Sequence, residues 1–283
     1  MIFKSLSLFS PEQIAASGQC FRMFEKNGAW TVVHRDKLLK ITPADGGFYF
    51  SCTENEFESV WREYFDLNED YGRFCAAVAG DEFLECAAAF GRGIRILKQD
   101  PWETLCSFLI SQNNNIPKIK KSVEMLCRAF GEERKTDDGE SFRLFPSAHR
   151  LANLNREEEA FFRKECLLGY RDKFVSAAAR GVATGKTDLK RMERLDNDNL
   201  FKELTALYGA GAKVASCVML FGFHRIDAFP VDTWMKKILD ARYGGRFNPE
   251  KYQGFQGVIQ QYMFYYYRSL SQQTSFSLHK NPV

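Results

Sequence analysis

The amino-acid sequence predicts an α+β protein with a small N-terminal antiparallel β-sheet domain and a mainly α-helical body behind it. Short runs of β-branched, aliphatic and aromatic residues fill residues 31–50 and are separated by turn residues, a pattern typical of antiparallel strands. From about residue 55 the apolar residues recur at helical spacing. We therefore expect a β-rich domain over 1–90, a helical body over 91–270 and a flexible tail over 271–283.

The strands are the first predicted elements. Residues 31–34 and 38–41 flank a short polar link, and a turn at 45–47 leads into a third strand at 48–50. The apolar residues between 57 and 65 then follow i, i+3, i+4 spacing, which predicts a helix with one face toward the core.

Helical patterns fill the body of the chain. Gly131 is placed as a helix C-cap, and residues 132–145 are predicted to be a polar connection. The predicted helices cover residues 102–112, 117–130, 147–153, 156–166, 171–184, 198–208, 212–222, 232–243 and about 250–270.

Composition excludes several classes of protein. The 283 residues are 45% hydrophobic and 27% charged, which suffices for a core and excludes wholesale disorder. The apolar runs fall far short of the roughly 20 residues of a membrane span, and the first residues lack the order of a secretory signal. The eight cysteines form no CxxC pair, and none follows Cys217. We expect a soluble cytoplasmic protein with reduced thiols and no zinc or iron–sulfur site.

The charge is unevenly distributed along the chain. Residues 1–90 hold 8 Lys and Arg against 14 Asp and Glu, whereas the remainder holds 31 against 22. A basic second part would face a polyanion. Ordinary variation of surface charge is the alternative interpretation.

The segment at residues 207–215 (LYGAGAKVA) carries the first functional signal. One helix ends at Gly209-x-Gly211 and the next begins at once. Glycine allows positive φ and a close approach of the backbone to a ligand, and the amide groups of a new helix N-terminus suit a phosphate. A plain connector between two helices has the same pattern, so both interpretations stay open here.

Lys213 and Asp232 form the candidate chemical pair. Lys213 lies just inside the second helix beside an apolar run, where partial burial would make its amine a nucleophile. A solvated surface lysine is the alternative. Asp232 precedes a helical pattern and fits an N-cap, a role that would also fix its carboxylate. The two residues are 19 positions apart, about one helix plus a return loop, so they can converge on one cleft.

The hairpin, Lys213 and the Pro-Val-Asp sequence ending at Asp232 together resemble the helix-hairpin-helix DNA glycosylases, and the lysine resembles their bifunctional members. Further motifs narrow the resemblance to the 8-oxoguanine DNA glycosylases and occur in that family's order. They are SGQCFR at 17–22, QNNNI at 112–116, LGYR at 168–171 and Gln260-x-x-x-Phe264. The resemblance covers most of the chain and implies a helix-hairpin-helix glycosylase body.

The resemblance also implies a role for each matching residue. Lys213 would be the Schiff-base nucleophile and Asp232 its electrostatic partner. The base would be held by Gly18 through its backbone carbonyl, by Cys217 and Phe264 on its two faces, and by Gln260 on its pairing edge. DNA contacts would come from Asn113, Lys118, Tyr170, Arg171, Gly209 and Gly211. On spacing alone, Cys217 and Phe264 would be core residues, the Asn run a turn and Arg171 a surface residue.

Three residues depart from the family's pattern. Tyr208 replaces a proline that is common in the hairpin, which leaves the shape of the loop open. Trp234 stands where some members have His, and its phosphate-side role is therefore in doubt. Lys118, which follows Pro117, stands where some members have an Arg for the opposite base.

The function implied by the resemblance is base-excision repair. The chain would excise 8-oxoguanine from double-stranded DNA and nick the abasic site through a lysine Schiff base, as a nucleoid-associated monomer if the source is prokaryotic. It would require no cofactor, with room for a structural monovalent cation at the hairpin. One alternative is a glycosylase for another damaged base, against which the pocket residues argue. The other is a non-catalytic DNA-binding protein, which would need neither Lys213 nor Asp232.

Overall fold

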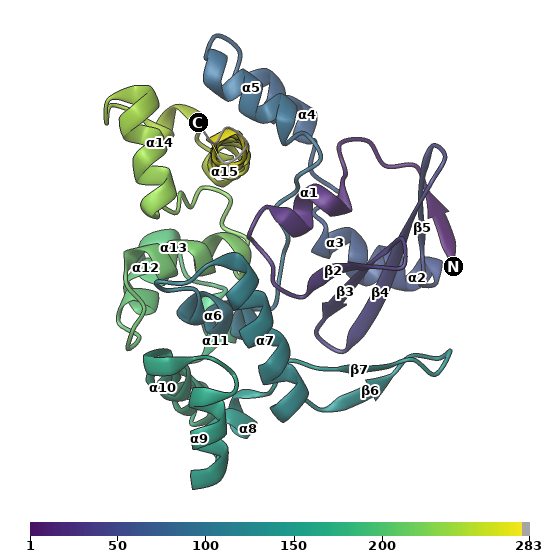
Figure 1. The fold of residues 1–283 in the computed structure, drawn as a ribbon, viewed down its shortest axis with the longest axis vertical. Helices are drawn as coiled ribbons and strands as arrows, with labels where there is room; N and C mark the ends of the chain where they lie inside the picture. The colour runs from purple at the N-terminus through teal and green to yellow at the C-terminus, as the bar shows by residue number, and fades with distance from the viewer. Residues whose placement is uncertain (279–283) are drawn as a thin grey trace.

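The computed structural model describes residues 1–278 and confirms the predicted fold class: a small antiparallel sheet lies beside a mostly helical body (Figure 1). The sheet has the strand order β1-β5-β4-β3-β2. Its strands are β1 (Ile2–Lys4), β2 (Met23–Lys26), β3 (Ala29–His34), β4 (Lys37–Ala44) and β5 (Gly47–Phe50).

The sheet buries one face against nearby helices. Val32, Leu39, Ile41 and Phe50 are fully buried there, and each such side chain contributes about 1.5–3 kcal/mol through removal from water. The register follows from this burial, because Ile41 pairs with both Trp30 and Phe50 and a slip of one residue would expose the whole set.

Sequence reasoning missed the two edge strands, β1 and β2, and the helix α1 (Pro11–Ala16). A signal for β2 was present. Asn27 and Gly28 both have positive φ and connect β2 to β3, and Asn-Gly is the strongest local indicator of a two-residue hairpin turn.

The helix predicted between 57 and 65 is present as a continuous helical stretch with a π-helical turn in its middle. It consists of α2 (Glu54–Glu56), the π-helix η1 (Phe57–Trp61) and α3 (Arg62–Tyr64). Phe57, Trp61 and Phe65 are fully buried against the sheet.

Two helices within 1–90 pack with the body rather than with the sheet. They are α4 (Tyr71–Ala77) and α5 (Glu82–Phe90). Their buried side chains belong to the larger core, and α5 packs against the C-terminal helix α15, which Figure 1 shows end-on. The smaller core consists mainly of residues up to Phe65, with Leu97 added. The two cores therefore separate near residue 70, whereas the predicted domain boundary is at residue 90.

The helical body follows the predicted order, with ends that differ by a few residues. The structure also contains a short helix, α11, that was not predicted. The elements are α6 (Pro101–Ile110), α7 (Ile116–Phe130), α8 (Ala148–Ala152), α9 (Arg156–Lys164), the 3₁₀ helix η2 (Gly169–Arg171), α10 (Asp172–Ala183), α11 (Leu189–Met192), α12 (Asn197–Thr205), α13 (Ala212–Phe221), α14 (Thr233–Tyr243), the 3₁₀ helix η3 (Pro249–Tyr252) and α15 (Gln256–Leu278).

Sequence reasoning missed the two strands within the polar connection predicted over 132–145. This segment forms a two-stranded hairpin of β6 (Glu133–Lys135) and β7 (Ser141–Arg143). Contacts from outside the segment hold it. Lys40 of β4 pairs with Glu140, and Arg22 donates to the carbonyl of Arg143. Such long-range contacts are invisible in the local polarity of the segment.

The predicted bounds of the last helix need correction. The residues near 250 form η3, and α15 begins only at Gln256. The helix then continues to Leu278, beyond the predicted end near residue 270, and the flexibility of 271–283 stays a prediction. Residues 279–283 lie outside the described residues. Among the helices of the described chain, none is long and apolar enough to cross a membrane.

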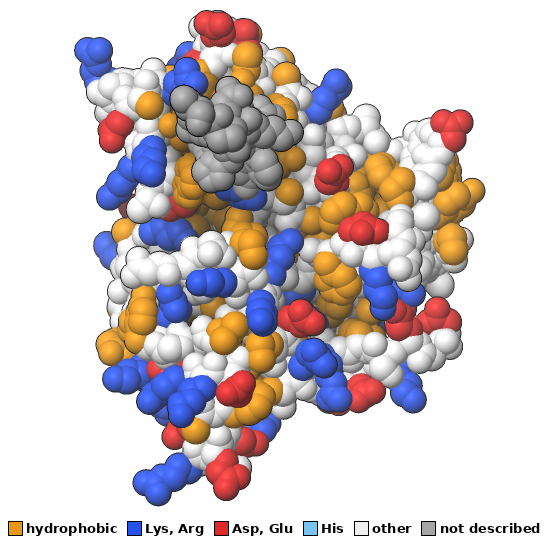
Figure 2. Space-filling view, viewed as in Figure 1, with side chains coloured by type: hydrophobic (Ala, Val, Ile, Leu, Met, Phe, Trp, Pro, Cys, Tyr) orange, Lys and Arg blue, Asp and Glu red, His pale blue; other side chains and the backbone are white. Residues whose placement is uncertain are grey.

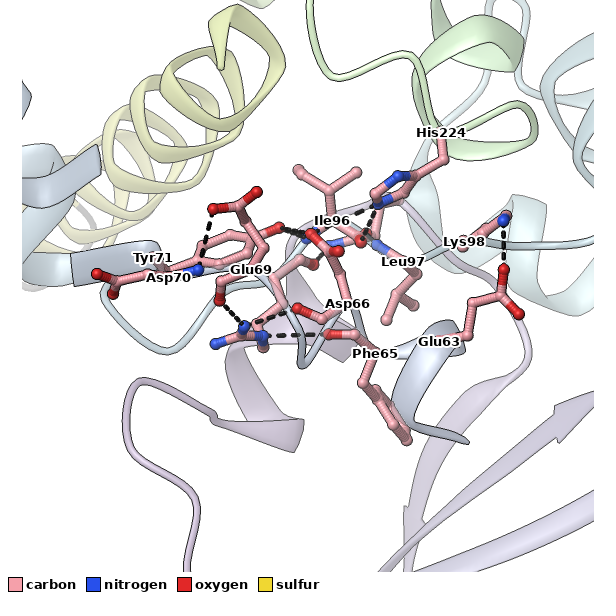
Figure 3. Close-up of polar contacts among 12 residues, drawn as sticks. Glu63, Phe65, Asp66, Glu69, Asp70, Tyr71, Ile96, Leu97, Lys98 and His224 are labelled. Carbon is pink, nitrogen blue, oxygen red and sulfur yellow. Dashed lines mark hydrogen bonds and ion pairs between the residues drawn. The ribbon is translucent and has the colours of Figure 1, made fainter. Parts of the chain in front are cut away.

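A buried arginine, Arg95, joins the two parts of the molecule. Figure 3 labels its partners Phe65, Asp66, Glu69 and Tyr71. Arg95 donates to the carbonyls of Phe65, Asp66 and Glu69 at 2.7–3.1 Å, and its guanidinium lies 4.2 Å from the ring centroid of Tyr71. The Tyr71 hydroxyl donates to the Asp66 carboxylate at 2.9 Å. A buried guanidinium without hydrogen-bond partners is very unfavourable. The loop between the two cores is therefore held where its carbonyls can accept from Arg95.

Candidate active site

A cavity of about 1020 Å³ opens where α6, α13, α15 and the loop after α1 meet. Its volume is at the upper end of the roughly 300–1,000 Å³ typical of ligand pockets. α6, α7 and α13 lie together in the middle of the molecule, with α15 beside them (Figure 1). Seven predicted site residues line the cavity: Gly18, Asn113, Lys213, Cys217, Asp232, Gln260 and Phe264.

The hairpin before α13 positions Lys213. Gly209 has a φ of +87°, and a Cβ there would lie 2.3 Å from the Phe174 ring, so only glycine fits. Gly211 differs, because it has a φ of −75° and open space where a Cβ would be. Of the two hairpin glycines, only Gly209 uses the positive φ that glycine allows. Helix α13 begins at Ala212 and places Lys213 in its first turn.

Lys213 is held at the cavity by neutral groups. Its Nζ donates to the Ser111 hydroxyl at 3.1 Å and lies 5.2 Å from the ring centroid of Phe108. Both partners come from the end of α6. Within the described chain Lys213 makes no ion pair with Asp232, although both residues line the same cavity.

Asp232 is the N-cap of α14, as the sequence predicts. Its Oδ1 accepts from the backbone amide of Met235 at 2.8 Å. The cap fixes the carboxylate at the cavity wall. Trp234 also lines the cavity, and its ring lies edge-on to Tyr267 with centroids 6.4 Å apart.

Cys217 and Phe264 come from α13 and α15, on two different walls of the cavity. Burial raises the pKa of the Cys217 thiol to about 11; the charge of Lys213 opposes this rise and that of Asp232 adds to it. Cys217 therefore stays a neutral thiol at ordinary pH. These shifts also show that the three groups are close enough to sense one another's charge.

Gly18 lies under the Phe264 side of the cavity. Its φ is +80°, and a Cβ would lie 2.9 Å from Ile116 Cδ1 and 3.4 Å from the Phe264 ring. Gln19 anchors this loop from behind. Its buried side chain donates to the carbonyl of Arg95 at 2.9 Å and accepts from the amide of Leu97 at 2.8 Å. Any side chain at position 18 would both strain the backbone and enter the cavity.

Gln260 is buried at the inner wall, where its Oε1 accepts from the Nε2 of Gln261 at 3.0 Å. This bond occupies the carbonyl end of the Gln260 amide and thereby orients the side chain. The partner itself keeps one polar atom unpaired, because Oε1 of Gln261 is buried without a hydrogen bond among the described residues.

Among the predicted DNA contacts, Asn113 lines the cavity, whereas Lys118, Tyr170 and Arg171 do not. Asn113 has a φ of +46°, and its Nδ2 donates to the Tyr170 hydroxyl at 3.1 Å. Arg171 donates to the backbone carbonyls of Gln112 and Asn113 at 2.5 and 2.8 Å. The Arg171 guanidinium thus hydrogen-bonds to the backbone of the protein's own loop. Lys118 is exposed in the first turn of α7.

Ser111 and Arg268 are among the cavity residues that sequence reasoning missed. Ser111 directly precedes the QNNNI motif, so extending that motif by one residue would have included it. Arg268 follows Phe264 by four positions and therefore lies on the same helix face. Its guanidinium carbon lies 5.6 Å from the Phe264 ring centroid, and its Nη1 is buried with no partner in the part of the chain that is described.

The basic charge of the helical body is dispersed. On the face in Figure 2, Lys and Arg side chains are scattered over the body with Asp and Glu between some of them, rather than gathered in one patch. Within residues 1–278 no group of three or more His, Cys, Asp or Glu is arranged to hold a metal ion.

Known proteins resemble this chain over most of its length. The model of the N-terminal domain of 8-oxoguanine DNA glycosylase matches residues 1–105. The chain is 31% identical over 225 residues to the probable N-glycosylase/DNA lyase of Methanothermobacter thermautotrophicus, covering 74% of this chain and 70% of that protein. It is 36% identical over 162 residues to the N-glycosylase/DNA lyase of Saccharomyces cerevisiae, covering 54% of this chain and 42% of that protein.

Solved structures agree. The 8-oxoguanine glycosylase/lyase of Clostridium acetobutylicum, bound to double-stranded DNA containing cytosine opposite 8-oxoguanine, superimposes with a TM-score of 0.87 at 32% identity. The match covers 96% of this chain and 99% of that one. Sequence motifs, fold and cavity thus lead to the same conclusion. The chain belongs to the 8-oxoguanine DNA glycosylases, the N-glycosylase/DNA lyases of the helix-hairpin-helix superfamily.

Proposed function

We propose that this protein excises 8-oxoguanine from duplex DNA and then nicks the abasic site through a Schiff base on Lys213. The observation that carries the proposal is the meeting of Lys213, Asp232 and Cys217 in one cavity with Gly18 and Phe264. A non-catalytic DNA-binding hairpin would need the glycines but would have no use for a lysine and a carboxylate at the wall of a base-sized cavity.

The first step is removal of the base. A base within the duplex is out of reach, so it must be extruded, at a cost of a few kcal/mol of unstacking. As the bond between C1′ and the base nitrogen breaks, its electron pair leaves with the base and positive charge develops on the sugar. The carboxylate of Asp232, fixed by its capping bond, stabilises that charge.

The second step uses the amine. The lone pair of Lys213 Nζ forms a bond to C1′, and the nitrogen then gives up a proton. The bond between C1′ and the ring oxygen breaks with its electron pair going to that oxygen, which takes up the proton, and the nitrogen lone pair forms the C=N bond of the imine. The imine acidifies the C2′ hydrogen. Its removal sends an electron pair toward C3′ and expels the 3′ phosphate, which nicks the strand.

The lesion is recognised at Gly18. 8-Oxoguanine carries a hydrogen on N7, where guanine has a lone pair, so a fixed backbone carbonyl favours the oxidised base. One buried hydrogen bond gained or lost is worth about 1–3 kcal/mol. The base itself would lie between Cys217 and Phe264, with Gln260 at its pairing edge.

Borohydride trapping tests the proposal. The wild-type protein should form a covalent adduct with a duplex that contains 8-oxoguanine, because borohydride reduces the imine to a stable amine. Lys213→Gln should form none while its affinity for the duplex stays within a few-fold of wild type. A covalent adduct with Lys213→Gln would overturn the assignment of the nucleophile.

The choice of lesion requires a separate experiment. A panel of duplexes with alkylated and oxidised bases distinguishes 8-oxoguanine from other damaged bases, and faster release of a different base would favour the alternative glycosylase. DNA binding without release of any base would favour a non-catalytic protein.

The proposal includes a monomer that needs no cofactor and works in the cytoplasm at the nucleoid, if the source is prokaryotic. A structural monovalent cation at the hairpin remains compatible with it. Light scattering of the free protein and of its DNA complex tests the oligomeric state, and activity after exhaustive chelation tests the need for a metal.

A further inference from the structure

Ser111 makes two hydrogen bonds that give its hydroxyl a fixed direction. It is nearly buried at the C-terminal end of α6, and its Oγ donates to the carbonyl of Phe108 at 2.7 Å. The same Oγ accepts from Lys213 Nζ at 3.1 Å. A hydroxyl has a single proton to donate, and here the backbone of α6 takes it.

The direction of that proton matters for a nucleophilic amine. A hydroxyl with a free proton would donate it to the lone pair of a neutral lysine and block the attack. Because the Ser111 proton is committed to Phe108, the oxygen can only accept from Lys213. The nitrogen lone pair is therefore left free to point into the cavity.

The surroundings of Lys213 add a second consequence. Its neighbours are the Ser111 hydroxyl, the face of the Phe108 ring and the neutral Cys217 thiol, and it makes no ion pair with Asp232 in the described structure. A neighbouring carboxylate favours the charged form of a lysine, whereas a neutral hydroxyl does so far less. Holding the side chain against α6 thus keeps it from pairing with Asp232.

We propose that Ser111 is a positioning residue that holds the amine of Lys213 by accepting its hydrogen bond, with the lone pair free and the side chain apart from Asp232. This inference rests on the proposed Schiff-base function. In this proposal Ser111 acts on imine formation through Lys213.

The test measures single-turnover borohydride trapping on a duplex with a preformed abasic site, which removes lesion recognition from the measurement. Ser111→Ala should trap about tenfold more slowly at saturating protein, with unchanged affinity for the duplex. Its trapping rate should also reach half of its maximum at a higher pH, because Lys213 becomes free to pair with Asp232. Ser111→Thr keeps the oxygen and should restore both properties.

Ser107→Ala is the matched control. Ser107 is buried one turn earlier on α6 and does not line the cavity. Its replacement should change neither the trapping rate nor its pH profile. If Ser111→Ala does not fold, Ser111→Cys keeps the shape while offering a much poorer acceptor, and it should show the same slow trapping and shifted profile.

The outcomes separate the two proposals. Failure of the wild-type protein to trap any abasic duplex would overturn the Schiff-base function. Normal wild-type trapping together with a wild-type rate and pH profile for folded Ser111→Ala or Ser111→Cys would overturn the role of Ser111 alone. A slower rate with an unshifted profile, not restored by Ser111→Thr, would mean that Ser111 only supports the local packing.

Discussion

Gly209 lies directly against the ring of Phe174, since a Cβ built on this glycine would be 2.3 Å from the ring carbon Cγ. Phe174 also packs edge-on against Tyr208, the residue that replaces the common proline, with centroids 5.1 Å apart. This aromatic contact packs against the hairpin at the position where a proline would otherwise restrict the backbone. Gly209 faces this ring and Gly211 faces open space, so substitutions at the two positions should have measurably different effects.

Gly209→Ala should destabilise the fold. The αL-like backbone costs a non-glycine residue about 1–2 kcal/mol, and the contact with Phe174 adds to this. Gly211→Ala is the matched variant, because its backbone suits alanine and its Cβ meets open space. It should keep the melting temperature but weaken DNA binding, since the new methyl would lie at the proposed phosphate contact of the hairpin. Equal melting temperatures for the two variants would contradict the geometry.

Asp232→Asn should slow base release much more than it weakens binding, because the charge matters most in the transition state. Asparagine caps helices about as well as aspartate, so its melting temperature should stay close to that of wild type. Asp232→Ala should lose about 1 kcal/mol of stability in addition. Single-turnover excision and thermal unfolding, measured on both variants, separate the two roles. A wild-type excision rate for Asp232→Asn would rule out the electrostatic role.

Recognition at Gly18 should depend on the hydrogen at N7 of the lesion. Replacing 8-oxoguanine by its 7-deaza analogue, which lacks that hydrogen, should slow excision by roughly 10- to 100-fold, as expected for one buried hydrogen bond of about 1–3 kcal/mol. Competition between the two duplexes in one reaction gives the ratio directly. Equal excision would show that the Gly18 carbonyl does not recognise the lesion.

Preference for the base opposite the lesion should be shallow. Lys118 offers a point charge on a flexible stem where a guanidinium fork would suit two acceptors, and one good base contact is worth roughly 1–3 kcal/mol. We expect cytosine to be only mildly preferred in single-turnover rates on four duplexes, and Lys118→Arg to steepen the ranking. A preference of several hundredfold in the wild type would show that Lys118 is compensated, for which Arg171 is the nearest candidate.

Acid should destabilise the protein partly through His34. Burial and then the charges of Arg35 and Arg22 lower the pKa of His34 to about 3 in the folded state, against about 6.5 in the unfolded chain. Above pH 6.5 neither state binds the proton. Below it only the unfolded state does, so this contribution is lost at up to about 1.4 kcal/mol per pH unit until about pH 3.

Denaturant unfolding at pH 7 and pH 5 checks this effect. The loss of stability between the two values should be smaller in His34→Phe than in wild type, because phenylalanine cannot bind the proton and keeps a ring beside Tyr64. His149→Gln is the control, since His149 is exposed and should leave the pH dependence unchanged. An identical pH dependence for His34→Phe and wild type would contradict the assignment.

The sequence by itself determined the fold class, the hairpin and the position of Asp232. Each of these depends on neighbouring residues. Alternating runs with turn residues gave the sheet, Gly209 follows from the close turn, and Asp232 caps the helix that begins at the next residue. The family motifs identified the other candidate site residues. Each motif is a short run of residues, and the order of the motifs can be read directly from the sequence.

Only the tertiary structure decided how those residues meet. Ser111 contacts Lys213 across 102 positions of sequence, and the hairpin at 133–143 is held by Lys40 and Arg22 from the other part of the chain. Helices α4 and α5 join the larger core because α15, far along the chain, covers them. The physical reason is the same in each case: burial and hydrogen-bond partners depend on which distant segment packs nearby, and local periodicity carries no information about that choice.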